Sequence, residues 1–182
     1  MNNAKYINYQ TGEVLDWFKV EQLHDNALLK VKPKLWEQWD FKKNNELGFD
    51  IWKLTFGSNE KVWWICEKGH KWDAVINNRD EEKGCPYCAN KKVMIGFNDM
   101  WTTNPELASM LLNYKDGHEY MQFSNKKLEW KCPNCRKIIE RKVRHVNEKG
   151  LHCSRCGVTS RSNKPQIKLL REKNVNVRIN KM

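Results

Sequence analysis

The seven cysteines of this 182-residue chain fall into short-spaced groups, and this spacing constrains the fold more than any other feature. Together with one histidine they make two sets of four. The first set is Cys66, His70, Cys85 and Cys88, and the second is Cys132, Cys135, Cys153 and Cys156. A structural zinc ion takes four nitrogen or sulfur ligands at tetrahedral corners, and two short-spaced pairs can supply them. The sequence therefore predicts two structural zinc ions.

Disulfides and redox-active Cys-x-x-Cys motifs are the alternatives. An odd number of cysteines with strict two-residue gaps suits disulfides poorly, and residues 1–10 contain no apolar signal segment that would imply export. Neither set lies in a strand–helix context of thioredoxin type. His145 and His152 are further candidate ligands, but His152 adjoins Cys153, which makes joint ligation awkward. We therefore expect reduced thiols in an intracellular protein.

Both ligand sets are complete, which leaves no open coordination position for zinc catalysis. The sequence contains no Gly-rich phosphate loop, nucleophile elbow or HNH-type histidine arrangement, and the acidic run at residues 80–82 is typical of a solvated turn. We expect no enzymatic activity and no small-molecule substrate. No stretch approaches the ~20 apolar residues of a membrane span, so we also expect a soluble protein without membrane association.

An internal repeat organises the middle of the chain. The segment Ser58–Cys66 recurs at residues 124–132 with an offset of 66, and Arg79 then corresponds to Arg144 at an offset of 65. Each copy predicts a β-hairpin around its first ligand pair, with strands at residues 61–65 and 71–76 and again at 128–131 and 137–143. A short helix should precede each hairpin, over residues 33–39 and from Asn104-Pro105-Glu106 onward.

Four segments follow from this organisation. Residues 1–32 form an accessory segment with a small hairpin over residues 6–18 that turns at Gly12. The first metal module spans residues 33–95 and the second, degenerate one spans residues 96–158. The stretches from Cys66 to Cys88 and from Cys132 to Cys156 are each too short to bury a sufficient apolar core, so each module should depend on its metal for folding. Residues 159–182 form a basic tail, with a linker at 159–163, a helix from Pro165 and a strand over residues 175–179.

The net charge of +11 is unevenly distributed. Residues 1–122 contain 16 Lys and Arg against 18 Asp and Glu, whereas residues 123–182 contain 17 against 4. A basic surface of this density attracts a polyanion, so DNA is the expected partner; a solvated lysine-rich surface is the alternative. The candidate phosphate contacts in the second module are Arg136, Lys137, Arg141, Lys142, Arg144, Lys149 and Arg155.

Arginines and tryptophans of the repeat allow two interpretations. Arg79 and Arg144 precede the second ligand pair of each copy, where they would contact DNA or brace the backbone. Three tryptophans could either stack on bases or pack in the core: Trp63, Trp64 and Trp72. Because neighbouring residues on a strand point to opposite faces, Trp64 and its counterpart Trp130 are expected in the core.

The first copy contains the motifs Val62-Trp63-Trp64-x-Cys66, Gly69-His70-x-Trp72, Arg79 and Gly84-Cys85-Pro86-Tyr87-Cys88. With these motifs the chain resembles a family of zinc-ribbon domains that occur, often in tandem, in bacterial, phage and giant-virus proteins. The second copy is degenerate, with Glu129 in place of Trp63. The resemblance implies a small, metal-stabilised α+β fold. It would consist of two tandem zinc-ribbon or treble-clef-like modules, each a ligand-bearing β-hairpin with a preceding short helix, in the cytoplasm of a bacterial or phage-infected cell.

Proteins that resemble this chain often continue into a Vsr-like endonuclease domain, and the matching place here reads Pro165-Gln166 without the catalytic carboxylates after it. We therefore expect a non-enzymatic zinc-binding protein that binds DNA through its basic second module and tail. One alternative is a phage-type adaptor or inhibitor that binds a host nuclease or another nucleic-acid enzyme. A targeting subunit for a nuclease on a separate chain is the other.

Overall fold

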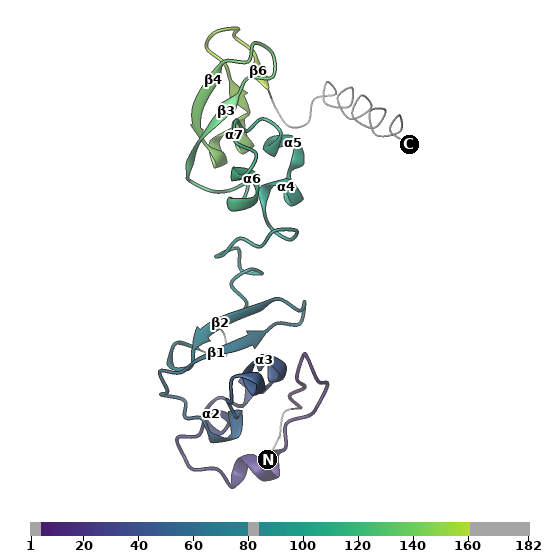
Figure 1. Ribbon diagram of the computed structural model, residues 1–182, viewed down its shortest axis with the longest axis vertical. Helices are drawn as coiled ribbons and strands as arrows, with labels where there is room; N and C mark the ends of the chain where they lie inside the picture. Colours follow the sequence, from purple (N-terminus) through teal and green to yellow (C-terminus); the bar gives the residue numbers. More distant parts are fainter. Residues whose placement is uncertain (1–4, 80–83, 161–182) are drawn as a thin grey trace, which may run out of the picture. The chain divides into compact units, whose positions relative to one another are not determined.

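The computed structural model describes residues 5–79 and 84–160 and divides into two compact units, residues 1–91 and 92–182 (Figure 1). Each unit has its own cluster of buried apolar side chains. The expected fold class is confirmed, because each unit is a small α+β module in which a β-hairpin adjoins a group of metal-ligand side chains. Within the described ranges, every helix is too short or too polar to span a membrane. The predicted helix and strand after Pro165 lie outside the described residues.

The first unit places short helices before its hairpin. In chain order the elements are α1 (Trp17–Glu21), α2 (Leu28–Val31), the 3-10 helix η1 (Pro33–Gln38), α3 (Phe41–Glu46), the 3-10 helix η2 (Ile51–Lys53), β1 (Lys61–Ile65), β2 (Lys71–Val75) and the 3-10 helix η3 (Ile76–Asn78). The N-terminal segment turns at Gly12 as predicted, with φ +74° and a bridge between Ile7 and Val14. The expected strand nevertheless ends earlier, because the Asp16 carboxylate accepts from the Lys19 N–H and starts α1.

The hairpin of the first unit is built around aromatic side chains. β1 pairs antiparallel with β2, so that Trp64 lies opposite Trp72, and both rings are buried. Trp39, at the end of η1, forms a bridge with Trp64 and packs against its ring edge-on (centroids 5.6 Å apart). The predicted helix of residues 33–39 is therefore a 3-10 helix, and it positions Trp39 against the hairpin. In Figure 1, α2 and α3 lie on one side of β1 and β2.

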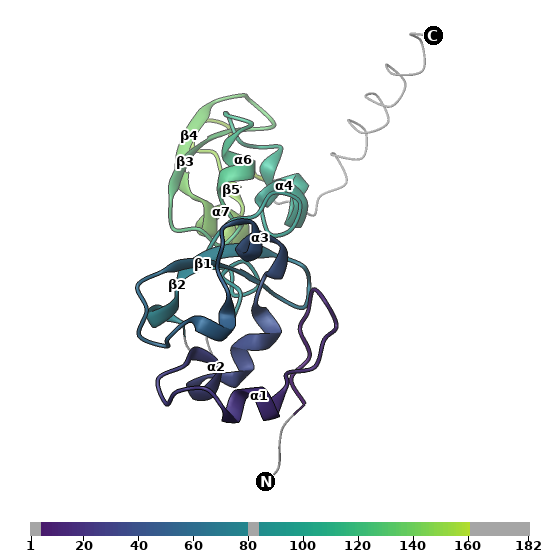
Figure 2. The ribbon, with the colours of Figure 1, turned by 60° about the horizontal axis from the view of Figure 1, so that its bottom comes forward.

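The second unit also places short helices before its hairpin, and it adds a longer helix and two short strands after it. Its elements are α4 (Met100–Thr103), α5 (Pro105–Ala108), α6 (Asp116–Glu119), β3 (Lys127–Lys131), β4 (Ile138–Lys142), α7 (Val143–Lys149), β5 (Leu151–His152) and β6 (Thr159–Ser160). Asn104 caps α5 as predicted, since its side chain accepts from the Leu107 N–H. Thr159 and Ser160, expected in a linker, pair instead with β5. Figure 2 shows β3 and β4 along one side of this unit and α4 on the other.

Matching hydrogen bonds define which positions of the two hairpins correspond. The indole N–H of Trp64 donates to the Ala74 carbonyl (3.2 Å), and that of Trp130 donates to the Arg141 carbonyl (2.9 Å). Trp64 and Trp130 differ by 66 positions, whereas Ala74 and Arg141 differ by 67. The second hairpin therefore contains one additional residue between its strands.

The additional residue lies in the ligand turn. In the first hairpin, the Cys66 N–H donates a hydrogen bond to the His70 carbonyl and closes the turn. In the second hairpin, the Cys132 N–H donates the corresponding hydrogen bond to the Lys137 carbonyl. The predicted offset of 65 between Arg79 and Arg144 assumed a second turn that is one residue shorter, because Cys-x-x-Cys replaces Cys-x-x-x-His. In the structure, Arg136 and Lys137 follow Cys135 before β4 begins, so the second turn is longer.

The register after the turn corrects the predicted correspondence of the two arginines. The Asn77 N–H donates to the Ser58 carbonyl (3.0 Å), and the Arg144 N–H donates to the Ser124 carbonyl (2.9 Å). Ser58 and Ser124 match at the offset of 66, so Arg144 occupies the position of Asn77 and not that of Arg79.

Candidate metal centres

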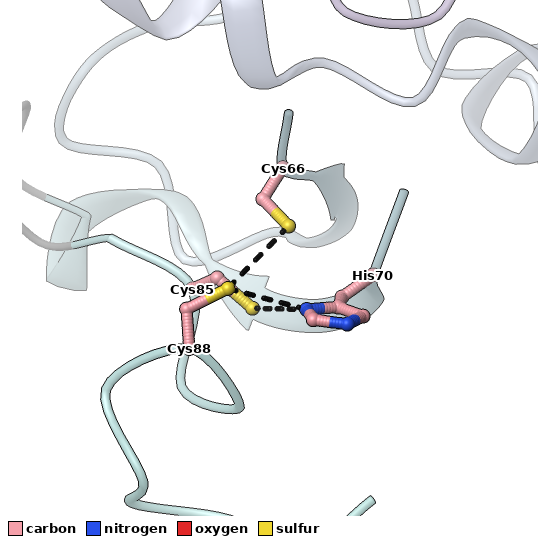
Figure 3. A group of neighbouring side chains, drawn as sticks. All are labelled: Cys66, His70, Cys85 and Cys88. Carbon is pink, nitrogen blue, oxygen red and sulfur yellow. Dashed lines mark hydrogen bonds between the residues drawn. The ribbon is translucent and has the colours of Figure 1, made fainter. Parts of the chain in front are cut away.

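The first group of ligands joins the hairpin turn to a later turn of the chain. Cys66 follows β1, His70 precedes β2, and Cys85 and Cys88 come from the turn at residues 85–90 (Figure 3). Their four ligand atoms all lie within 4.8 Å of one another. His70 Nδ1 is 3.2 Å from Cys88 Sγ and 3.7 Å from Cys85 Sγ, and Cys66 Sγ is 3.9 Å from Cys88 Sγ. Zinc–sulfur bonds of about 2.3 Å and zinc–nitrogen bonds of about 2.0 Å give a tetrahedron with S···S edges of about 3.8 Å and N···S edges of about 3.5 Å, close to these distances.

Local backbone conformation positions these ligands. Gly69 has φ +78° and its N–H donates to the Cys66 carbonyl (2.8 Å), which turns the chain so that His70 faces Cys66. On the other side, the Ala89 N–H donates to the Cys85 carbonyl (3.0 Å), which closes a second tight turn. The imidazole of His70 presents Nδ1 to the thiols, so this nitrogen is the one that would coordinate zinc.

The second group is made of four cysteines. Cys132 Sγ is 3.8 Å from Cys156 Sγ, and Cys135 Sγ is 3.5 Å from Cys153 Sγ, again the edges of a zinc–thiolate tetrahedron. All four sulfur atoms lie within 4.8 Å of one another. The seven cysteines of the two groups are free thiols rather than disulfides.

Two turns of the same type hold the second site. The residue after each second cysteine, Arg136 or Gly157, has a left-handed backbone conformation, with φ +60° and +67°. Each of these residues donates its N–H (2.9 Å) to the carbonyl of the first cysteine of its pair. The two turns therefore present their sulfur atoms to a common point. Both predicted structural zinc sites are confirmed by this geometry.

Individual thiols of the two sites differ in acidity. Burial raises the pKa of the Cys85 thiol to about 11. Hydrogen bonds from the Asn134 side chain and from the Val158 N–H lower the pKa of Cys156 to about 6. Zinc binds thiolates, so the raised pKa of Cys85 opposes metal binding and the lowered pKa of Cys156 favours it.

The sequence around the first site matches a family model. Residues 35–91 match the model of a family described as a probable treble-clef zinc finger domain. This zinc finger contains all four ligands of the first site, and the match ends shortly after Cys88. The second zinc site lies outside the matched range and is supported by its own geometry. No curated protein matches the chain.

The structure places Arg79 inside the zinc finger and not on a DNA-binding surface. Its side chain is 4% exposed, and its guanidinium donates to the Gln38 side-chain oxygen and lies over the rings of Trp64 and Trp72. The Lys32 ammonium in turn donates to the Arg79 carbonyl (2.5 Å). Arg79 is thus a brace, as one of the two sequence interpretations held, and it does not belong to the predicted DNA contacts.

The tryptophans of the hairpins are buried or partly exposed as the alternation of side chains along a strand predicts. Trp64 and Trp130 are completely buried and Trp72 is nearly so, whereas Trp63 is half-buried on the opposite face of β1. The Lys43 ammonium lies over the Trp63 ring, 3.3 Å from its centroid. Trp63 is therefore engaged within the zinc finger, and the stacking role considered for these rings is not favoured at Trp64 or Trp72.

The seven candidate phosphate contacts of the second unit are all exposed, but they separate into two groups. Four lie on or after β4, close to Glu140 and Glu148: Arg141, Lys142, Arg144 and Lys149. Of these, Arg144 forms an ion pair with Glu148 (2.8 Å). The other three, which we call the turn group, lie in the ligand turns of the second zinc site: Arg136, Lys137 and Arg155. The sequence contains no acidic residue at positions 130–139 or 149–160, so the turn group has no neighbouring carboxylate within these segments.

Proposed function

We propose that this zinc-binding chain binds DNA through the basic surface of its second unit. Residues 1–91 contain 14 Lys and Arg against 14 Asp and Glu, whereas residues 92–160 contain 12 against 7. Residues 161–182, which lie outside the described range, add 7 against 1 in the sequence. Phosphates attract such a surface, and the release of their counterions makes the affinity strong and salt-dependent. The single observation that carries the proposal is the turn group, because its three cations are exposed and have no acidic neighbour in the ligand turns.

The zinc site makes these cations suitable for phosphate contact. Each member of the turn group lies within two residues of a cysteine ligand, so the metal fixes the backbone that bears it. The Lys137 ammonium donates to the Ser154 hydroxyl (3.2 Å), which links the two ligand turns. A backbone fixed in this way loses little conformational freedom on binding, and this favours affinity.

The turn group has a competing role near the metal. Four thiolates and one Zn²⁺ have a formal charge of −2, and nearby cations stabilise such a complex. If this were their only role, removal of the cations would weaken zinc retention and leave DNA binding unchanged. Zinc content must therefore be measured together with DNA affinity.

Matched charge variants test the proposal. Arg136→Ala, Lys137→Ala and Arg155→Ala together remove three charges from the turn group, and Arg141→Ala, Lys142→Ala and Lys149→Ala together remove three from β4 and α7. We expect the first variant to weaken duplex DNA binding more and to lower the slope of log K against log salt by about 0.9 per lost contact. Equal affinity and slope in the wild type and the turn-group variant would contradict the proposal.

We also propose that the chain has no enzymatic activity of its own. Both zinc sites have four protein ligands, whereas catalytic zinc keeps one position for water or substrate. Phosphodiester hydrolysis by the zinc-loaded protein above the level of a Cys153→Ser variant would oppose this proposal.

A second candidate function is that of an adaptor or targeting subunit for a nuclease or another nucleic-acid enzyme. The first unit favours it, because this unit is electrically neutral and exposes large apolar side chains, among them Phe18 (75%) and Leu47 (57%). Aromatic side chains are enriched at protein interfaces. Absence of salt-dependent DNA binding by the intact protein would favour this candidate over the first.

A further inference from the structure

A buried carboxylate fixes one histidine of the second unit. Asp99 is completely buried, and its Oδ2 lies 3.0 Å from His118 Nδ1. Its Oδ1 accepts from the Gly96 N–H (2.9 Å) and from the Thr102 hydroxyl. Asp99 is therefore held on both oxygens, and the His118 ring is held in turn. With Nδ1 engaged, Nε2 is the ring nitrogen that remains for a ligand at this partly exposed side chain.

An exposed aromatic ring lies beside this histidine. Tyr114 is 62% exposed, and its ring packs on the Trp101 indole at a centroid distance of 4.6 Å and an angle of 32°. His118 contacts the Tyr114 ring edge-on at 5.2 Å. The Trp101 N–H also donates to the Tyr114 carbonyl (2.9 Å), so both the backbone and the ring of Tyr114 are positioned. Trp101 covers one face of Tyr114, and the high exposure of Tyr114 leaves the other face to a ligand.

The first unit shows that the fold does not require the carboxylate–histidine pair. α2 and α4 start at corresponding positions, because the Leu28 N–H donates to the Leu54 carbonyl (2.8 Å) and the Met100 N–H donates to the Tyr120 carbonyl (3.0 Å). The residue before α2 therefore corresponds to the residue before α4. In the same way, the residue two positions before Leu54 corresponds to the residue two positions before Tyr120.

These positions contain apolar residues in the first unit. Ala27 stands in the place of Asp99, and Trp52 stands in the place of His118, where it packs against Trp36 (centroids 5.4 Å apart). Burial of a carboxylate is unfavourable unless its hydrogen bonds are satisfied, so an alanine and a tryptophan are the simpler solution for stability. The polar pair of the second unit is therefore explained better by ligand binding than by folding.

The cluster of Trp101, Tyr114 and His118, which we call the aromatic cluster, borders the hairpin of β3 and β4. The Leu112 N–H donates to the Glu129 carbonyl on β3 (2.9 Å), and Tyr114 follows two residues later, within about 7 Å along the chain. Lys131 is exposed on the outer face of the same strand. The two carboxylates of α6 disfavour a phosphate at the cluster itself. An uncharged base is therefore the part of a nucleic acid that suits this place, with its phosphates on the neighbouring cations.

We propose that Tyr114 and His118 form a stacking site for an unpaired base of single-stranded DNA, an assignment that rests on the proposed DNA binding and adds the strandedness of the target. The free face of Tyr114 is the platform, and His118 Nε2 is a hydrogen-bonding group at its edge. Aromatic side chains stack on every base because each base has a π-face, so the site binds without strong sequence preference. Paired bases in a duplex are stacked on one another and are not available to it.

Fluorescence anisotropy of the full zinc-loaded chain with a labelled oligo-dT strand, and with a duplex of the same length, tests this site. We expect Tyr114→Ala to weaken single-strand binding about fivefold to a hundredfold, as expected for one lost stacked base, and to leave duplex binding unchanged. Tyr114→Phe keeps the ring and should bind as the wild type does. Since stacking releases no counterions, the salt slope of Tyr114→Ala should equal that of the wild type, unlike the slope of the turn-group variant.

Three outcomes would overturn the assignment, and they are distinguishable from one another. If Tyr114→Ala binds the single strand as tightly as the wild type, the stacking site is refuted while DNA binding stands. If His118→Ala also retains full affinity, the role of the histidine is refuted separately. If the wild-type chain binds neither strand nor duplex, the proposed function itself is wrong and the stacking site falls with it. Zinc content and near-ultraviolet circular dichroism of each variant control for folding.

Discussion

The Arg79 guanidinium donates a hydrogen bond to the Gln38 side-chain oxygen (2.5 Å) inside the core of the first unit. Gln38 ends η1, and Arg79 follows η3, so this contact joins the helical segment to the chain that leaves the hairpin. The guanidinium also lies 5.1 Å from the ring of Trp64 and 5.4 Å from that of Trp72. A buried charge of this kind is costly once a partner is lost.

Replacement of Arg79 by alanine should therefore lower the free energy of unfolding of the first unit by about 2–4 kcal/mol, since Gln38 would lose its buried donor and the tryptophans would lose a packing partner. Lys42→Ala is the control in the same unit and should change this free energy by less than about 0.5 kcal/mol, because the Lys42 side chain is exposed. Urea unfolding at saturating zinc, followed by tryptophan fluorescence, measures both. Equal stability of the two variants would contradict the bracing role.

Metal analysis should find two zinc ions per chain, one for each ligand group. Cys85→Ser and Cys153→Ser should each reduce this number to one, because each removes a ligand from a different site. Chelation at neutral pH should unfold both hairpins, since modules of this size depend on their metal. Retention of two ions in Cys153→Ser would instead show that another group, such as the adjacent His152, replaces the lost thiolate.

Stability of the first unit should depend on Asp40 in acid. Burial would raise the pKa of Asp40, but the Lys71 ammonium (2.7 Å) and hydrogen bonds from the Lys43 N–H and the Gln10 side chain outweigh it and hold the pKa below its usual value. A carboxylate whose pKa is lowered by folding stabilises the protein above its ordinary pKa of about 4, and this stabilisation is lost as the pH falls through the folded-state pKa.

Comparison of the wild type with Asp40→Asn isolates this effect, because protonation of the zinc ligands affects both proteins alike. We expect the variant to be less stable by about 1–3 kcal/mol at pH 7, and the difference to shrink as the pH falls below about 4. A difference that stays constant from pH 7 to pH 3 would show that Asp40 does not act through its charge.

Gly117→Ala should destabilise the second unit by about 1–3 kcal/mol, because a Cβ at this position would collide with the Trp101 indole. Gly57→Ala is the matched control, since a Cβ there would meet no atom within 4 Å and the backbone has no positive φ. Thermal unfolding of the zinc-loaded variants gives the comparison. A Gly117→Ala protein as stable as Gly57→Ala would show that Trp101 moves aside without cost.

The ligand groups and the hairpins were predictable because their signals are local. Cysteine spacing identifies both zinc sites, and alternation along β1 places Trp64 in the core and Trp63 on the other face. The strands end within one residue of their predicted limits, since the ligand turn and the apolar pattern specify the register together.

Contacts between distant segments were not predictable in the same way. The length of the ligand turn depends on the conformation of Arg136, which has no clear sequence signal. The turn length was therefore predicted wrongly, and Arg144 was assigned as the counterpart of Arg79 in the second unit. The pairing of Asp99 with His118 joins residues 19 apart, and neither belongs to a periodic pattern. Only the folded chain shows that these side chains meet.

The two ligand turns differ by one residue while the hydrogen bonds on both sides of them remain the same, and this has a consequence for engineering. A loop inserted between Cys132 and Lys137, or between Cys66 and His70, would lengthen a segment that the strand ladder does not include. Provided that the ligand atoms still reach the metal, such an insertion would leave every cross-strand pair in register. The strand ladder thus tolerates a change in the length of the ligand turn, and the limit on that change is the ligand spacing that the zinc ion requires.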